Sequence, residues 1–298
     1  MTALQVRKPP FAFDEDTPFQ WNPANPQFGL VMNGLSFVAP AFERLMVAGT
    51  RAAMAEITDP DVLAEADAFL RQEAMHARAH QGHTKALVAK YPGLQGVLDE
   101  LAVRYEKVQA RPLRYQLAYA ADIEATFTPM FNVMLRHRDS LFDNGDHRVA
   151  PLFLWHLVEE IEHRSSALII YDAIVPSPWY RLRVMPSVMA HIIGCFNVFL
   201  RGVDASIPAA DRGIDATDMI VGRNAVRAMF RRPRMPGQFA TVPRREIAAM
   251  VWRLAKSQIP GHRPANAITP PFADEWLAAY DDGRDVVHWY DDEVLDPA

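Results

Sequence analysis

The sequence has few cysteines and only a small net charge. Its 298 residues include one cysteine, Cys195, so no disulfide can form within the chain. The formal net charge is −5, without the basic excess that marks nucleic-acid-binding proteins. A lone thiol is typical of a reducing compartment. We therefore expect a cytoplasmic protein that binds no nucleic acid.

Long hydrophobic runs are also scarce. The N-terminal MTALQVRKPPFAF lacks the apolar stretch and small-residue cleavage site of a secretory signal peptide. Residues 184–200 are apolar, but this stretch is shorter than a membrane span of roughly 20 residues and contains Pro186, His191 and Asn197. We expect a buried core helix there, with a membrane-contacting helix as the alternative.

Strand-type alternation is nearly absent, and helical periodicity dominates after the first 30 residues. Pro40 suits the first turn of a helix, and Pro129 predicts a kink within one. Turn-forming residues and prolines bound the expected long helices, which run over about 40–57, 61–90, 112–138, 147–175 and 179–203. The sequence thus predicts an all-α protein.

The composition divides the chain into three parts. Residues 1–30 are rich in Pro, Asn and aromatics and predict an extended arm. Residues 31–206 hold the long helices, including an apolar fifth one. Residues 207–298 predict a C-terminal helical extension packed on the bundle, with shorter helices at about 216–231, 244–257 and 271–281.

The stretch WHLVEEIEHR, residues 155–164, places metal-type side chains on one helix face. At 100° per residue, His156, Glu160 and His163 fall within about 60° of one another. Glu159 lies about 60° off this stripe and Glu162 further, so we expect them to be solvated or to support a ligand. Three such side chains among Leu, Val and Ile indicate either a solvent-exposed helix face or a metal site.

The other long helices carry matching residues. Glu43 and Glu124 are lone carboxylates in apolar surroundings, on the first and third helices. Glu73 and His76 form a Glu-x-x-His pair on the second helix, and Glu160 with His163 repeats that pair on the fourth. One such pair arises easily by chance. This set, however, has the number and kind of ligands found in a four-helix di-iron carboxylate bundle, with one Glu on each of two helices and a Glu-x-x-His pair on each of the other two. A charged helix face is the alternative.

Further residues near this set have open roles. His80 follows His76 by one turn, and we expect it to line the cavity or support a ligand, with direct ligation as the alternative. His83 is expected near the helix end in solvent. Tyr119 is expected to be an ordinary core aromatic, with electron transfer near the metals as the alternative.

At these residues the chain resembles known families. The order Glu, Glu-x-x-His, Glu, Glu-x-x-His is similar to that of the ferritin-like di-iron superfamily. WHLVEEIEH and ERLMV more narrowly resemble a bacterial family labelled predicted metal-dependent hydrolase, over roughly residues 30–260. The resemblance implies a ferritin-like four-helix bundle with additional C-terminal helices.

A second resemblance concerns helix four. His-x-x-x-Glu-x-x-His is similar to the motif of the di-iron arylamine N-oxygenases, in which an extra histidine ligates one iron. This resemblance implies seven ligands here, namely Glu43, Glu73, His76, Glu124, His156, Glu160 and His163. The spacings between helices differ from that family, which puts a shared substrate in doubt.

The function expected from these residues is a dinuclear iron oxidase or oxygenase, with Mn or a mixed Fe/Mn pair as alternatives. It would use O₂ on a small organic substrate and an external reductase, because the sequence has no Gly-rich nucleotide motif or cysteine cluster. A hydrolase that activates water on two metals is the alternative. The apolar fifth helix suggests a homodimer, and membrane contact is not expected.

Overall fold

The computed structural model describes residues 4–221 and 237–291. Within these residues every regular element is a helix, as the sequence predicts. The α-helices are α1 (Pro26–Met54), α2 (Pro60–Lys90), α3 (Gln95–Gln109), α4 (Leu113–Arg136), α5 (Arg138–Leu141), α6 (Ala150–Glu162), α7 (Ser166–Ile174), α8 (Trp179–Ser206), α9 (Ala209–Arg212), α11 (Arg244–Ser257) and α12 (Pro271–Asp281). The short 3₁₀ helices are η1 (Pro92–Leu94), η2 (Ala216–Met219), η3 (Pro264–Asn266) and η4 (Val286–His288).

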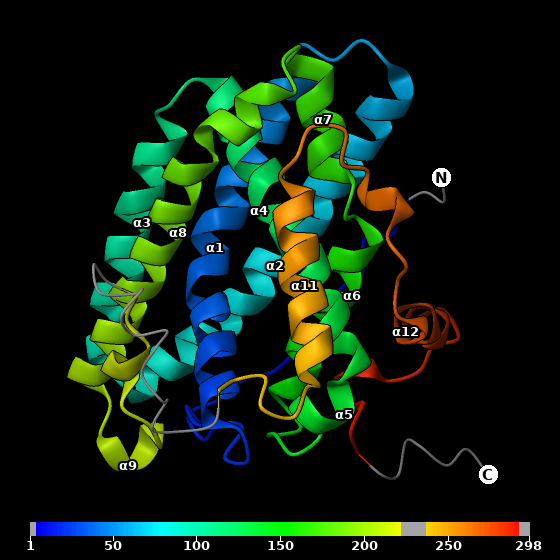
Figure 1. Cartoon of the computed structure of the whole chain (residues 1–298). Helices are drawn as coiled ribbons and strands as arrows, with labels where there is room; N and C mark the ends of the chain where they lie inside the picture. The colour runs from blue at the N-terminus through cyan, green and yellow to red at the C-terminus, as the bar shows by residue number, and fades with distance from the viewer. Residues whose placement is uncertain (1–3, 222–236, 292–298) are drawn as a thin grey trace.

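The long helices pack in layers (Figure 1). Helices α1, α2, α4 and α6 lie together at the centre, and α7 continues α6 beyond a break while packing on α2 and α4. Helices α3 and α8 form one side of the molecule. On the other side α11 packs on α4, and α12 packs on α6. The ferritin-like classification and the division into three domains stay predictions.

Helix α1 begins at Pro26 rather than at Pro40. The Asn25 side chain accepts the Phe28 N–H and Pro26 occupies the first turn, which together start the helix. Pro40 therefore lies inside α1, where it removes one backbone N–H. Most of α1 is buried, and this packing stabilises the helix across the proline.

The predicted fourth helix, 147–175, is divided. Helix α6 ends at Glu162 and α7 starts at Ser166, with His163 as the C-cap of α6. The Arg164 guanidinium donates hydrogen bonds to the carbonyls of Ile161 and Pro264, at 2.6 and 3.1 Å. No Gly or Pro marks this break, so local sequence signals could not show it.

Two helices, α1 and α8, are long and apolar enough to cross a membrane by length and composition, which is weak evidence for a span. The apolar window of α1 is 83% buried inside the protein, whereas that of α8 is 22% buried. Residues 184–200 do form a helix, but most of it is not buried inside the protein. The expectation of a buried core helix there is therefore wrong. The homodimer and the cytoplasmic location stay predictions, and the helix expected at 216–231 lies mostly outside the described residues.

The contact between α8 and α3 gives a stability prediction. A Cβ at Gly202 would overlap the Val97 side chain, which is β-branched and stiff. Gly202→Ala should therefore lower the free energy of unfolding by about 1–3 kcal/mol in a urea titration. Gly96→Ala on α3 meets nothing within 4 Å and should be neutral or slightly stabilising. Equal stability of the two variants would contradict this packing.

Candidate metal centre

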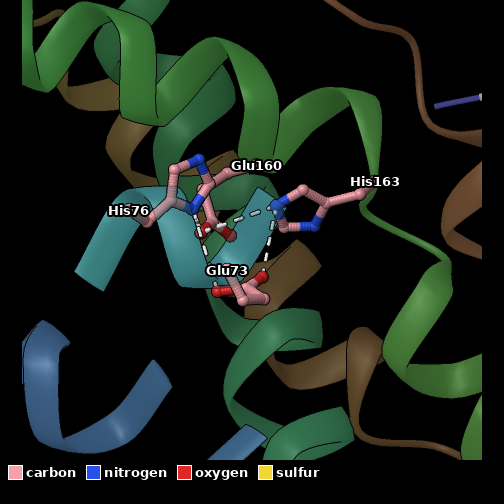
Figure 2. A group of neighbouring side chains, drawn as sticks. All are labelled: Glu73, His76, Glu160 and His163. Carbon is pink, nitrogen blue, oxygen red and sulfur yellow. Dashed lines mark ion pairs between the residues drawn. The ribbon is translucent and has the colours of Figure 1, made fainter. Parts of the chain in front are cut away.

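Four buried side chains meet between α2 and the end of α6 (Figure 2). Glu73 and His76 come from α2, and Glu160 and His163 come from α6 and its C-cap. Each offers one ligand atom, and these atoms all lie within 4.8 Å of one another. All four residues are 3% exposed or less. Such a concentration of ligand atoms, shielded from water, suits a metal ion.

Both carboxylates face both imidazoles. Glu73 places Oε2 3.7 Å from His76 Nδ1 and Oε1 3.4 Å from His163 Nε2. Glu160 Oε1 lies 3.7 Å from His76 Nδ1 and 3.8 Å from His163 Nε2. Ligand atoms that share one ion are about 3 Å apart. Each carboxylate is therefore placed to reach an ion beside either histidine.

The other three predicted ligands lie around this group. Glu43, His76 and His156 form a second set whose ligand atoms lie within 4.8 Å of one another. Glu124 Oε2 lies 3.8 Å from His163 Nδ1. The structure thus brings all seven predicted residues into one buried cluster, drawn from α1, α2, α4 and α6.

The cluster is poorly satisfied by hydrogen bonds. Within the described residues, both carboxylate oxygens of Glu73, both ring nitrogens of His163 and Nδ1 of His76 are buried without a hydrogen-bond partner. One carboxylate oxygen each of Glu43, Glu124 and Glu160 is also buried without a hydrogen-bond partner. An unsatisfied buried polar group costs about 1–3 kcal/mol. The donor set of four carboxylates and three imidazoles fits divalent metal ions, which would satisfy these atoms.

The orientation of His76 is fixed from the outside. Its Nε2 lies 2.9 Å from Glu159 Oε2, so its Nδ1 faces the cluster. The Arg7 guanidinium in turn donates to Glu159 at 3.2 Å and to Glu162 at 2.8 Å. Arg7 lies in the N-terminal segment and was not expected from the sequence, where nothing distinguishes it. Glu159 is thus buried against a predicted ligand and not solvated, and its role in supporting that ligand stays a prediction.

His156 connects the cluster to a chain of buried histidines. Its Nε2 lies 2.9 Å from Glu160 Oε1, and its Nδ1 contacts His80 Nε2. Ser36 Oγ then lies 2.7 Å from His80 Nδ1 and 2.8 Å from His83 Nδ1. His80 therefore contacts a predicted ligand instead of facing the cluster. The expectation that His83 reaches solvent is wrong, since it is fully buried.

The comparison with known families agrees with this chemistry. Residues 5–239, well over half of the chain, match the model of a family described as predicted metal-dependent hydrolase. The chain belongs to this family. The name indicates a metal-dependent enzyme, and the buried cluster is a group of side chains that could hold such a metal. No curated protein and no solved structure matches the chain.

Tyr119 lies outside the cluster of predicted metal ligands. Its hydroxyl contacts His191 Nδ1 at 2.8 Å and donates to the Tyr105 hydroxyl at 3.3 Å. None of the seven predicted ligands hydrogen-bonds to it within the described residues. The structure therefore favours an ordinary core aromatic over an electron-transfer residue.

Burial sets the protonation of the cluster. Desolvation raises the pKa values of Glu43, Glu124 and Glu160 well above their ordinary range, and neighbouring carboxyls raise them further. Desolvation lowers the pKa of His163, so its imidazole is neutral. Burial also lowers the pKa of His76, but its hydrogen bond with Glu159 and the nearby Glu73 carboxylate outweigh this and raise it to about 10. Without metal, His76 is therefore protonated near neutral pH, and the three carboxyls keep their protons to a higher pH than ordinary glutamates do.

This protonation predicts how metal affinity depends on pH. A metal ion that binds His76 must displace its proton, so metal affinity should rise steadily from pH 6 to pH 8, and the raised pKa values of the carboxyls act in the same direction. Competition with a chelator of known affinity at each pH measures this slope. Affinity that is independent of pH would contradict the assigned protonation.

Proposed function

We propose that the chain is a hydrolase whose cluster holds two divalent metal ions. The supporting observation is that Glu73 and Glu160 each face both His76 and His163, which is the arrangement needed for carboxylates that bridge two ions. The family description favours hydrolysis over other metal-dependent chemistry. Two metals several ångströms apart lower the pKa of a bound water and polarise an ester or phosphate.

The remaining residues divide between the two ions. Glu43, His76 and His156 would hold one ion, since their ligand atoms converge. His163 would hold the other through Nε2, the nitrogen that faces Glu73 and Glu160, and Glu124, whose Oε2 lies 3.8 Å from the Nδ1 of the same ring, would complete that set. Glu159 and Arg7 keep the Nδ1 of His76 toward the metals. Burial of all these ligands excludes bulk water, which strengthens their interaction with the ions.

An O₂-dependent oxidase or oxygenase is the second candidate. Four carboxylates and three histidines on helices are a donor set that also suits iron. Phe131 adds an aromatic ring 6.4 Å from the His156 ring, stacked on Phe127, so part of the surroundings is apolar. This function requires iron, a small organic substrate and an external electron donor.

Metal reconstitution under argon separates the two functions. Protein loaded with zinc, manganese or iron is offered a panel of carboxylic and phosphate esters, and water labelled with ¹⁸O traces the bond that is cleaved. The hydrolase proposal predicts turnover without O₂ and label in the product. Glu160→Gln should lose this activity, whereas Glu246→Gln, which removes a partly exposed carboxylate paired with His137, should keep it. Turnover that requires both iron and O₂ would replace the hydrolase with the oxygenase.

A further inference from the structure

A pocket of about 600 Å³ lies between α4, α11 and the loop that follows α11. Its rim carries Arg136, Arg253, Lys256 and Arg263, and no carboxylate lines it. The side chains of these four cations form no ion pair with an acidic side chain within residues 4–221 and 237–291. A cluster of unpaired cations is notable in a chain with net charge −5. The rim therefore favours a negatively charged ligand.

The floor of this pocket is polar and buried. Thr128 and Asn132 line it although each is only 4% exposed. The Asn132 side chain forms no hydrogen bond with the part of the chain that the structure describes, and its buried Oδ1 has no partner. A buried amide without a partner is costly unless a ligand satisfies it.

The pocket lies one helical turn from a residue of the metal cluster along α4. Glu124, Thr128 and Asn132 follow one another at four-residue spacing, so they lie on one face of the helix. The Thr128 hydroxyl donates to the Glu124 carbonyl at 3.2 Å. From the floor at Thr128 to Glu124 is one helical turn, about 6 Å.

The loop wall is also linked to the cluster. Arg164, the residue after His163, donates to the carbonyls of Pro264 and Ala265 at 3.1 and 3.4 Å. This loop then runs on to residues 266–269, which line the pocket. The same segment that ends α6 at a predicted ligand therefore positions one wall of the pocket.

We propose that this pocket binds the anionic group of the substrate, a carboxylate or phosphate carried on an apolar body. The inference rests on the proposed function, because it places the substrate of that metal centre. The anion pairs with the rim cations, as guanidinium and ammonium groups favour. Pro129 and Ile268 provide apolar surface for the body, and Thr128, on the floor, lies one helical turn from Glu124.

Calorimetry with defined probes tests this site on the full-length, metal-loaded protein. Phenylphosphonate and benzoate are the anionic probes, and benzyl alcohol is the neutral one. The double variant Arg253→Gln/Lys256→Gln should weaken binding of the anions about tenfold or more, since each removes a charged contact. The matched double variant Arg244→Gln/Arg245→Gln changes the same charge on α11 outside the pocket and should shift binding less than twofold.

Either of two results overturns the proposal. Equal weakening by both double variants would show a general charge effect, and benzyl alcohol binding as tightly as benzoate would show that the rim cations play no part. Glu160→Gln separates this inference from the proposed function. Anion binding retained in Glu160→Gln supports the pocket even if the wild type hydrolyses nothing. Binding lost in Glu160→Gln but kept in Arg253→Gln/Lys256→Gln would place the anion on the metals and contradict the pocket.

Discussion

Glu160→Gln should reduce bound metal from two ions per chain to a small fraction of one. Glu160 Oε1 faces three histidines, with His156 at 2.9 Å, His76 at 3.7 Å and His163 at 3.8 Å, so it is the most connected carboxylate of the cluster. Glutamine keeps the size of the side chain but removes the charge that a divalent ion requires. We expect metal affinity to fall at least a hundredfold.

Elemental analysis and thermal unfolding measure this effect together. The variant should remain folded, because it removes a buried acid from a crowded cluster, and its Tm should no longer respond to added metal. Glu246→Gln serves as the control, since Glu246 also pairs with a histidine, His137, but is 28% exposed on α11. Metal content equal to that of the wild type in Glu160→Gln would show that the cluster does not bind the metal.

Arg7→Ala should destabilise the protein strongly, although Arg7 lies outside the cluster. Arg7 is 3% exposed and pairs with Glu159, which is fully buried, and with Glu162, which is 18% exposed. Removing the guanidinium takes one of its two charged partners from the buried Glu159 carboxylate and leaves His76 as the other, at a cost of about 3 kcal/mol. His76 then loses its fixed orientation, so metal affinity should fall by about 10–100-fold.

A matched control makes the Arg7 result specific. Arg71 forms an ion pair with Asp67 on the surface of α2, with both side chains more than 40% exposed. Arg71→Ala should cost less than about 1 kcal/mol and leave metal affinity unchanged. Arg7→Lys keeps the charge without the two-pronged geometry and should fall between Arg7→Ala and the wild type. An Arg7→Ala protein with unchanged stability and metal affinity would remove Arg7 from the account.

The cluster could be predicted because its pattern is local. Glu73 with His76 and Glu160 with His163 are three residues apart, and any helix places such pairs on one face. Apolar neighbours of Glu43 and Glu124 indicated burial, which the structure confirms at 1% and 3% exposure. Helix type and most helix ends followed from periodicity and proline positions in the same way.

Features that depend on tertiary contacts could not be predicted. The break after α6 depends on Arg164 reaching Pro264, 100 residues further along the chain. Arg7 reaches Glu159 across 152 residues, and Ser36 connects His80 with His83 from another helix. The continuation of α1 through Pro40 likewise depends on its burial, which overrides the local preference of proline.

Anomalous X-ray diffraction from crystals of the metal-loaded protein tests the dinuclear centre most directly. We expect two anomalous peaks enclosed by α1, α2, α4 and α6. Each should lie about 2.0–2.5 Å from carboxylate oxygens and a histidine nitrogen, with Glu73 and Glu160 touching both. A single peak, or peaks away from these side chains in protein that is fully loaded, would contradict the account.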